Sequence, residues 1–177
     1  MYFCTSPSSI LIYPALRQML SQYKRFIEDT GVAVSIFGRV RVFEEVYSDD
    51  NEAAAKALRA GCNHLIQSTA SDMMLVALTE IERRMRAADL ESILVSTVHD
   101  SLVLDCVRAE LSKVHEIVMS VLNNFPGVFA SLFGNTFDTS WMIVPFTGDC
   151  EVGLNYLNMR KIPKKDMDWD KLLSSKH

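Results

Sequence analysis

His99 and Asp100 stand side by side in a short polar segment between two apolar, β-rich runs, residues 92–96 and residues 102–107. Runs of this composition, so closely spaced, predict a tight β-hairpin with the pair at its turn. A carboxylate that two strands hold in place is a rigid ligand for a hard cation such as Mg²⁺, which prefers oxygen donors. Asp100 is therefore a candidate metal ligand, and a polar turn without chemistry is the alternative for the pair taken alone.

Arg59, Asn63 and Gln67 follow one another at intervals of four residues in a segment that we expect to be helical. At about 100° per residue, their side chains fall within one narrow stripe. All three donate hydrogen bonds, and the minor groove of a duplex offers acceptors at every base pair. This donor stripe suits an enzyme that copies a template, because it checks the width of a pair without reading its sequence. A solvated helix face is the alternative.

These two features, in this order and at this separation, resemble the carboxy-terminal palm of family A DNA polymerases, the group that includes bacterial DNA polymerase I and many phage replicases. Three stretches carry the resemblance, namely residues 37–41 (Phe-Gly-Arg-Val-Arg), 59–72 and 98–101. Within them, residues 63–72 are most similar to phage members. Residues 144–153 resemble the family's final palm strand, so the resemblance covers about residues 13–153.

The resemblance implies an α+β fold and a partial domain. We expect an antiparallel palm sheet that includes the His99-Asp100 hairpin and packs against long helices. Residues 1–12 are expected to form an N-terminal loop, residues 13–153 the C-terminal part of the palm domain, and residues 154–177 a polar C-terminal tail.

The same resemblance implies a DNA-directed DNA polymerase, a nucleotidyltransferase of DNA replication, and gives roles to individual residues. Asp100 would bind Mg²⁺. His99 would contact the primer terminus and not the metal, because Mg²⁺ prefers oxygen ligands to the nitrogen of an imidazole. Ser101 stands where many members have Glu, which puts a third-carboxylate role at this position in doubt.

The resemblance also implies a surface for primer–template DNA. The donor stripe would lie in the minor groove near the active site, and charge-assisted contacts to the duplex backbone would come from Arg39 and Arg41. For these two arginines a solvated strand face is the alternative, since residues 39–42 alternate between charged and apolar side chains.

Two parts of the family pattern do not occur in this sequence. They are the earlier palm strand with the other catalytic Asp, and the fingers helix whose Lys and Arg hold the incoming dNTP. By the family's order, both precede residue 1. We therefore expect two Mg²⁺ ions shared with an upstream Asp, a partner made of fingers, thumb and the rest of the palm, and no activity of the chain alone. The alternative is a non-catalytic DNA-binding or assembly remnant of a polymerase.

Composition sets broader bounds. With 177 residues, 49% of them hydrophobic, the chain can bury the core of one domain. Its net charge of −4 argues mildly against DNA binding, since nucleic-acid binders are often basic. The four cysteines are too widely spaced for a zinc knuckle or a disulfide scaffold. Neither a leader peptide nor a run of about 18 apolar residues occurs, so we expect the cytoplasm, which for a phage-type protein is that of the infected bacterial host.

Further elements follow from periodicity and from Gly and Pro. We expect a helix from Pro14 to Gly31, strands over 32–37 and 39–42, a helix from about Glu52 that breaks at 67–69 and continues to about Ala88, a helix over 109–124 that ends at Pro126, an irregular stretch over 128–140, and strands over 141–152.

Overall fold

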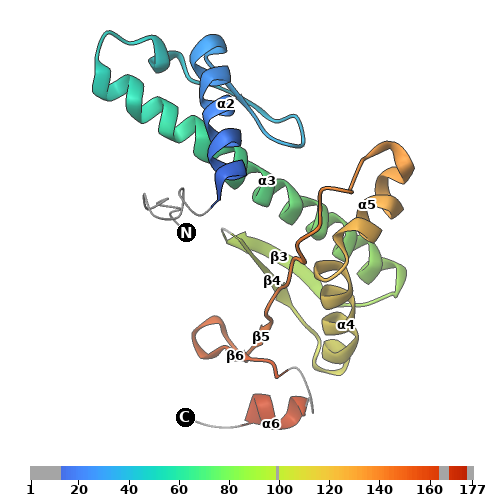
Figure 1. Cartoon of the computed structure of the whole chain (residues 1–177). Helices are drawn as coiled ribbons and strands as arrows, with labels where there is room; N and C mark the ends of the chain where they lie inside the picture. The colour runs from blue at the N-terminus through green and yellow to red at the C-terminus, as the bar shows by residue number, and fades with distance from the viewer. Residues whose placement is uncertain (1–12, 99, 164–167, 175–177) are drawn as a thin grey trace. The chain divides into compact units, whose positions relative to one another are not determined.

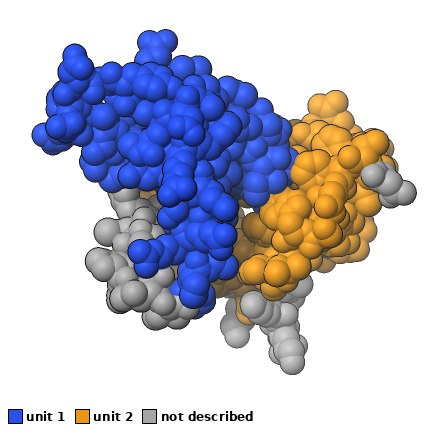
Figure 2. Space-filling view, turned by 45° about the horizontal axis from the view of Figure 1, so that its top comes forward, with its two compact units in different colours: residues 1–73 blue, residues 74–177 orange. Residues whose placement is uncertain are grey.

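The computed structural model describes residues 13–98, 100–163 and 168–174 (Figure 1). The chain divides into two compact units, residues 1–73 and residues 74–177, which Figure 2 colours separately. The expected loop at residues 1–12 lies outside the described residues, and so does His99.

The first unit contains a helix, a hairpin and the beginning of a long helix. Its elements are α2 (Pro14–Thr30), β1 (Val32–Val34), β2 (Val40–Val42), the short 3₁₀ helix η1 (Glu44–Tyr47) and the first part of α3 (Asn51–Ala87).

The prediction of α2 is confirmed at both ends. Pro14 occupies the first turn, where its missing N–H is no loss. Gly31 ends the helix in the left-handed conformation, at φ 67°, and its N–H donates to the Ile27 carbonyl at 2.8 Å. The helix then turns directly into β1, which pairs with β2 so that Ala33 lies opposite Arg41.

The core of the first unit gathers side chains from each of these segments. Ile27, Ala33, Phe43 and Ala57 are buried together, one each from α2, β1, the residue before η1, and α3. Because these four side chains form one hydrophobic cluster, the β1–β2 hairpin packs against α3.

The prediction that a helix breaks at residues 67–69 is wrong, since α3 runs without interruption for 37 residues. Hydroxyl side chains often weaken helices because they compete for backbone hydrogen bonds. Here the Ser68 and Thr69 hydroxyls donate to the carbonyls of His64 and Leu65, one turn back in the same helix. Because both hydroxyls bond to carbonyls of the same helix, the backbone stays helical and α3 continues.

The second unit contains the rest of α3 and the remaining elements. They are β3 (Ile93–Val98), β4 (Ser101–Asp105), η2 (Arg108–Glu110), α4 (Leu111–Leu122), α5 (Phe125–Phe133), η3 (Gly134–Thr136), β5 (Glu151–Val152), η4 (Tyr156–Asn158), β6 (Arg160–Lys161) and α6 (Trp169–Ser174).

The strands of the described residues form three separate two-stranded antiparallel sheets, β1–β2, β3–β4 and β5–β6. The mixed helical and antiparallel composition of the α+β prediction is confirmed. The single palm sheet that the resemblance implied is replaced, in the part of the chain that the structure describes, by three small ones.

The helix expected over residues 109–124 is confirmed as η2 followed by α4, but Pro126 does not simply end it. Pro126 lies in the first turn of α5, and the Asn124 side chain caps this helix by accepting from the Gly127 N–H at 3.1 Å. An irregular stretch was expected over residues 128–140, but residues 128–133 belong to α5 and are helical. This helix buries Val128 and Phe129.

The short helix α6 contacts η2 and α4 of the same unit. Asp170 of α6 pairs with Arg108 at 2.7 Å, and the Trp169 ring meets the His115 ring edge-on, with 5.7 Å between centroids. Burial lowers the pKa of His115.

Across the described residues no single helix is long and apolar enough to cross a membrane. One pair, Arg108–Leu122 with Phe125–Phe133, meets these criteria only together and is bent by 88°.

Candidate metal and nucleic-acid site

Asp100 lies in the turn between β3 and β4, with an exposed side chain. The two strands pair so that Val98 lies opposite Ser101, and the Ser101 hydroxyl donates to the Val98 carbonyl at 2.8 Å. The Asp100 carboxylate is therefore accessible next to the last paired residues of the two strands. His99 precedes it outside the described residues, so its role stays a prediction.

Glu110 fixes the base of this hairpin. Its carboxylate accepts from the Glu91 N–H at 3.1 Å, the Ser92 N–H at 2.9 Å and the Ser92 hydroxyl at 2.6 Å. These donors, the Ser92 hydroxyl first, lower the pKa of the Glu110 carboxyl because they stabilise its charged form. The start of β3 is thereby tied to the helical segment that follows β4, and sequence spacing alone did not indicate this contact.

The donor set around Asp100 decides whether a metal fits there. Asp100 offers the exposed carboxylate oxygens that Mg²⁺ prefers. Among the described residues, no group of three or more His, Cys, Asp and Glu side chains is placed to bind a metal ion. The residues present therefore fit one ligand of a metal centre and do not form a complete one.

The donor stripe lies on α3 in the first unit. Arg59 and Gln67 are exposed and Asn63 is half-buried. Because α3 is continuous, the spacing of four residues keeps the three side chains on one face of one helix. No hydrogen bond or ion pair of these side chains is found within the part of the chain that the structure describes. They are therefore available to an external acceptor.

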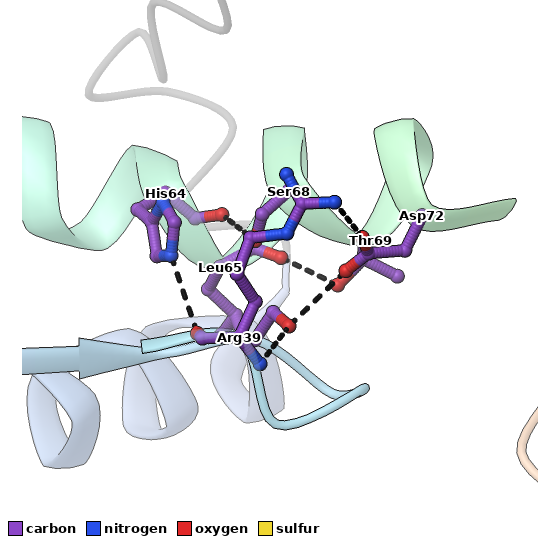
Figure 3. A network of polar contacts seen from close by, with 7 residues as sticks. Arg39, His64, Leu65, Ser68, Thr69 and Asp72 are labelled. Atoms are coloured by element: carbon purple, nitrogen blue, oxygen red, sulfur yellow. Dashed lines mark hydrogen bonds and ion pairs between the residues drawn. The ribbon is translucent and has the colours of Figure 1, made fainter. Parts of the chain in front are cut away.

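Arg41 and Arg39 leave the β1–β2 hairpin in different environments. The Arg41 guanidinium lies over the Phe43 ring, 4.8 Å from its centroid, and the residue is exposed. The Arg39 guanidinium donates to the Asp72 carboxylate of α3, as Figure 3 shows. The His64 ring contributes to the same region, with its Nε2 atom 3.5 Å from the Arg39 carbonyl oxygen.

Sequence reasoning missed the part that Asp72 plays. The resemblance gave no individual role to Asp72, which lies within the continuous helix α3. Asp72 accepts hydrogen bonds from Arg39 and from the Ser35 hydroxyl, which lie 33 and 37 residues away in the sequence. No sequence pattern links residues so far apart, so neither partner of Asp72 was predictable.

The predicted site residues are divided between the two units. The donor stripe and the two arginines belong to residues 1–73, and Asp100 belongs to residues 74–177.

Over about two thirds of its length, the chain has the fold of part of a polymerase domain. It superposes on the solved structure described as the POL domain of Pol1 from M. smegmatis in complex with DNA primer-template and dNTP, with a TM-score of 0.61. The match has 24% sequence identity and covers 66% of this chain and 20% of that one. The sequence model of DNA polymerase family A matches residues 10–157, and the chain belongs to this family.

Curated relatives come from phages and bacteria. The chain is 30% identical over 144 residues to the DNA polymerase of Bacillus phage SP01, covering 81% of this chain and 15% of the phage protein. It is 29% identical over 147 residues to DNA polymerase I of Chloroflexus aurantiacus, which covers 83% of this chain and 14% of that protein. It is 26% identical over 118 residues to the DNA polymerase of Escherichia phage T5, which covers 66% of this chain and 14% of the phage protein. The chain thus spans about a seventh of the length of these relatives.

Proposed function

We propose that the chain acts in template-directed DNA synthesis, as the C-terminal part of a DNA-directed DNA polymerase. The observation that carries this proposal is the family match over residues 10–157, which includes both the donor stripe and the turn with Asp100. The exposed Asp100 carboxylate beside the paired ends of β3 and β4 supports a role at the reacting end of the primer.

In this proposal Asp100 holds one end of a divalent metal site, and His99 beside it contacts the terminal nucleotide of the primer. Two bound Mg²⁺ ions, about 4 Å apart, would activate the primer 3′-hydroxyl and stabilise the charge on the triphosphate and leaving pyrophosphate. The contribution of this chain is to fix the carboxylate. The β3–β4 pairing and the Glu110 contacts at the hairpin base limit how far it moves.

The first unit supplies the duplex contacts. Arg59, Asn63 and Gln67 donate to the base-pair acceptors of the minor groove, which are alike enough at every pair for sequence-independent binding. Arg39 and Arg41 bind backbone phosphates, and such contacts give affinity and register without sequence preference. Few positive charges suffice for this role, which is consistent with a net charge of −4.

The remaining metal ligands and the dNTP contacts are proposed to come from fingers, thumb and the rest of the palm. We therefore expect no primer extension by the 177-residue chain alone, because one carboxylate cannot hold two cations. Extension is expected to return when a polypeptide with the second catalytic Asp and the fingers helix is added. A gel assay of primer extension measures both. Extension by the pure chain would contradict the proposed division of the site, and duplex binding without any restored extension would favour a DNA-binding remnant.

Gln67→Ala is expected to weaken binding of a primer–template duplex about threefold to tenfold, the effect of one lost neutral hydrogen bond. The slope of affinity against salt should stay unchanged, because glutamine carries no charge and releases no counterion. Fluorescence anisotropy with a labelled duplex measures both quantities. Gln22→Ala, an exposed glutamine on α2, is the matched control and should bind as the unmodified chain does. Equal effects of the two substitutions would argue against the donor stripe.

A further inference from the structure

Arg39, Ser35 and Asp72 form a closed ring of hydrogen bonds between the β1–β2 hairpin and α3. Figure 3 labels Arg39 and Asp72 of this ring. The Arg39 N–H donates to the Ser35 hydroxyl oxygen at 3.0 Å, and that hydroxyl donates to Asp72 Oδ2 at 3.3 Å. The Arg39 Nη2 atom donates to Asp72 Oδ1 and completes the ring. Both carboxylate oxygens and both ends of the arginine are therefore engaged.

The turn that carries Arg39 is fixed by its backbone as well. The Ser35 N–H donates to the Arg39 carbonyl at 2.9 Å, and the Gly38 N–H donates to the Ser35 carbonyl at 2.9 Å. Gly38 has φ 80°, a conformation that glycine adopts without strain. Ser35 is only 5% exposed. The hairpin end is thus rigid where it meets α3.

Within this ring the Asp72 carboxylate is largely buried, whereas the Arg39 guanidinium stays accessible to solvent. The Asp72 side chain is 13% exposed, whereas the Arg39 side chain is 45% exposed. A guanidinium has five N–H donors, and the contact with Asp72 uses Nη2. Donors on the other nitrogens remain for an anion that approaches from solvent. A side chain held in place in advance loses less conformational entropy when it binds.

We propose that Asp72 is a positioning residue for DNA binding, which fixes the Arg39 guanidinium in the orientation that a backbone phosphate of the duplex requires. The inference rests on the proposed function, because it assumes that this hairpin meets DNA. Its consequence runs against simple electrostatics. A carboxylate near a phosphate should weaken binding by repulsion, whereas an orienting carboxylate strengthens it through its partner.

The test compares Arg39→Gln, Asp72→Asn and the double variant in the full 177-residue chain, with a labelled primer–template duplex at several salt concentrations. Arg39→Gln is expected to weaken binding about fivefold to tenfold and to lower the salt slope by about one, the effect of one lost phosphate contact. Asp72→Asn is expected to weaken binding by a similar factor and to lower the slope as well. The double variant should bind no more weakly than Arg39→Gln, since Asp72 acts only through Arg39.

Asp29→Asn is the charge control, because it removes an exposed carboxylate from α2 of the same unit. It should leave binding unchanged or tighten it slightly. Asp72→Glu is the second variant and keeps the net charge while moving the carboxylate by one methylene. It is expected to weaken binding, whereas an effect of charge alone leaves it unchanged. Thermal unfolding shows which variants are folded. If Asp72→Asn does not fold, the binding of Asp72→Glu decides whether Asp72 positions Arg39.

The outcomes separate the two proposals. Tighter binding by Asp72→Asn, normal binding by Asp72→Glu, or independent effects in the double variant would overturn the positioning role while duplex binding by the unmodified chain upholds the proposed function. The positioning role is also overturned if Arg39→Gln weakens duplex binding and neither Asp72 variant does. If the unmodified chain binds no duplex, the DNA contact itself fails, and the role of Asp72 fails with it.

Discussion

Asp100→Asn is expected to slow primer extension by at least about a thousandfold once the chain is combined with the remainder of a polymerase. The substitution keeps the size of the side chain and one oxygen but removes the negative charge that holds a cation. Stabilisation of transition-state charge by a metal is worth several kcal/mol, and about 4 kcal/mol corresponds to three orders of magnitude in rate. Single-turnover extension at saturating duplex and dNTP measures this loss.

Duplex affinity should change by less than about twofold in the same variant, because phosphate and groove contacts carry the affinity. Asp105→Asn is the matched control, since Asp105 is exposed at the far end of β4 in the same hairpin. It should extend primers at a normal rate. A normal rate for Asp100→Asn would contradict the assignment of Asp100 as a metal ligand, and a lost rate for Asp105→Asn would show that the hairpin tolerates no charge change.

The sequence was informative wherever local chemistry decides the structure. The start and end of α2 follow from Pro14 and Gly31, each of which acts within one helical turn. The β3–β4 hairpin follows in the same way from two apolar runs with a short polar segment between them. The pairing of β3 with β4 was therefore predictable from the composition of this segment.

Contacts between distant residues were not predictable in this way. Asp72 and Arg39 are 33 residues apart, and nothing in the spacing of either residue indicates the other. Local rules also failed where two of them competed. Pro126-Gly127 marks the end of one helix by composition, yet the Asn124 cap makes it the start of α5. Which rule prevails depends on the burial of Val128 and Phe129, a tertiary effect.

The strands expected over residues 141–152 show a further limit. Apolar residues such as Ile143 and Val144 are typical of a buried strand, but here they are exposed, and of that stretch only residues 151–152 form a strand. β-propensity describes how well a side chain fits a pleated, half-buried surface, so it depends on a neighbouring strand. Among the described residues, the two-stranded β5–β6 pair gives residues 143 and 144 no such neighbour.

Glu80→Gln is expected to lower the free energy of unfolding by about 2 kcal/mol, the largest effect we expect from a single polar substitution in the second unit. The Glu80 side chain is fully buried and accepts from Arg83 at 2.7 and 2.8 Å and from Arg84 at 2.7 Å. Breaking a buried ion pair costs about 3–5 kcal/mol, and the partial exposure of both arginines reduces this cost. Urea unfolding followed by circular dichroism measures the difference.

Glu82→Gln is the matched control, because Glu82 lies on the same helix and pairs with Arg86 at 2.7 Å, but in solvent. An exposed pair contributes about 0–1 kcal/mol, so this variant should unfold close to the unmodified chain. Similar losses in both variants would mean that burial of Glu80 adds nothing to its ion pairs.

The stability difference due to Glu80 should also depend on pH in one direction. Its hydrogen bonds with Arg83, and then with Arg84, lower the pKa of the Glu80 carboxyl in the folded chain. A carboxyl with a lowered pKa stabilises the fold above its unfolded pKa, about 4.3 for Glu, and loses this contribution as the pH falls through the folded value. The difference between the unmodified chain and Glu80→Gln should thus be constant near neutral pH and shrink in acid, because protonated Glu80 resembles glutamine. A difference that stays the same from pH 7 to below the folded pKa would show that the loss arises from packing and not from charge.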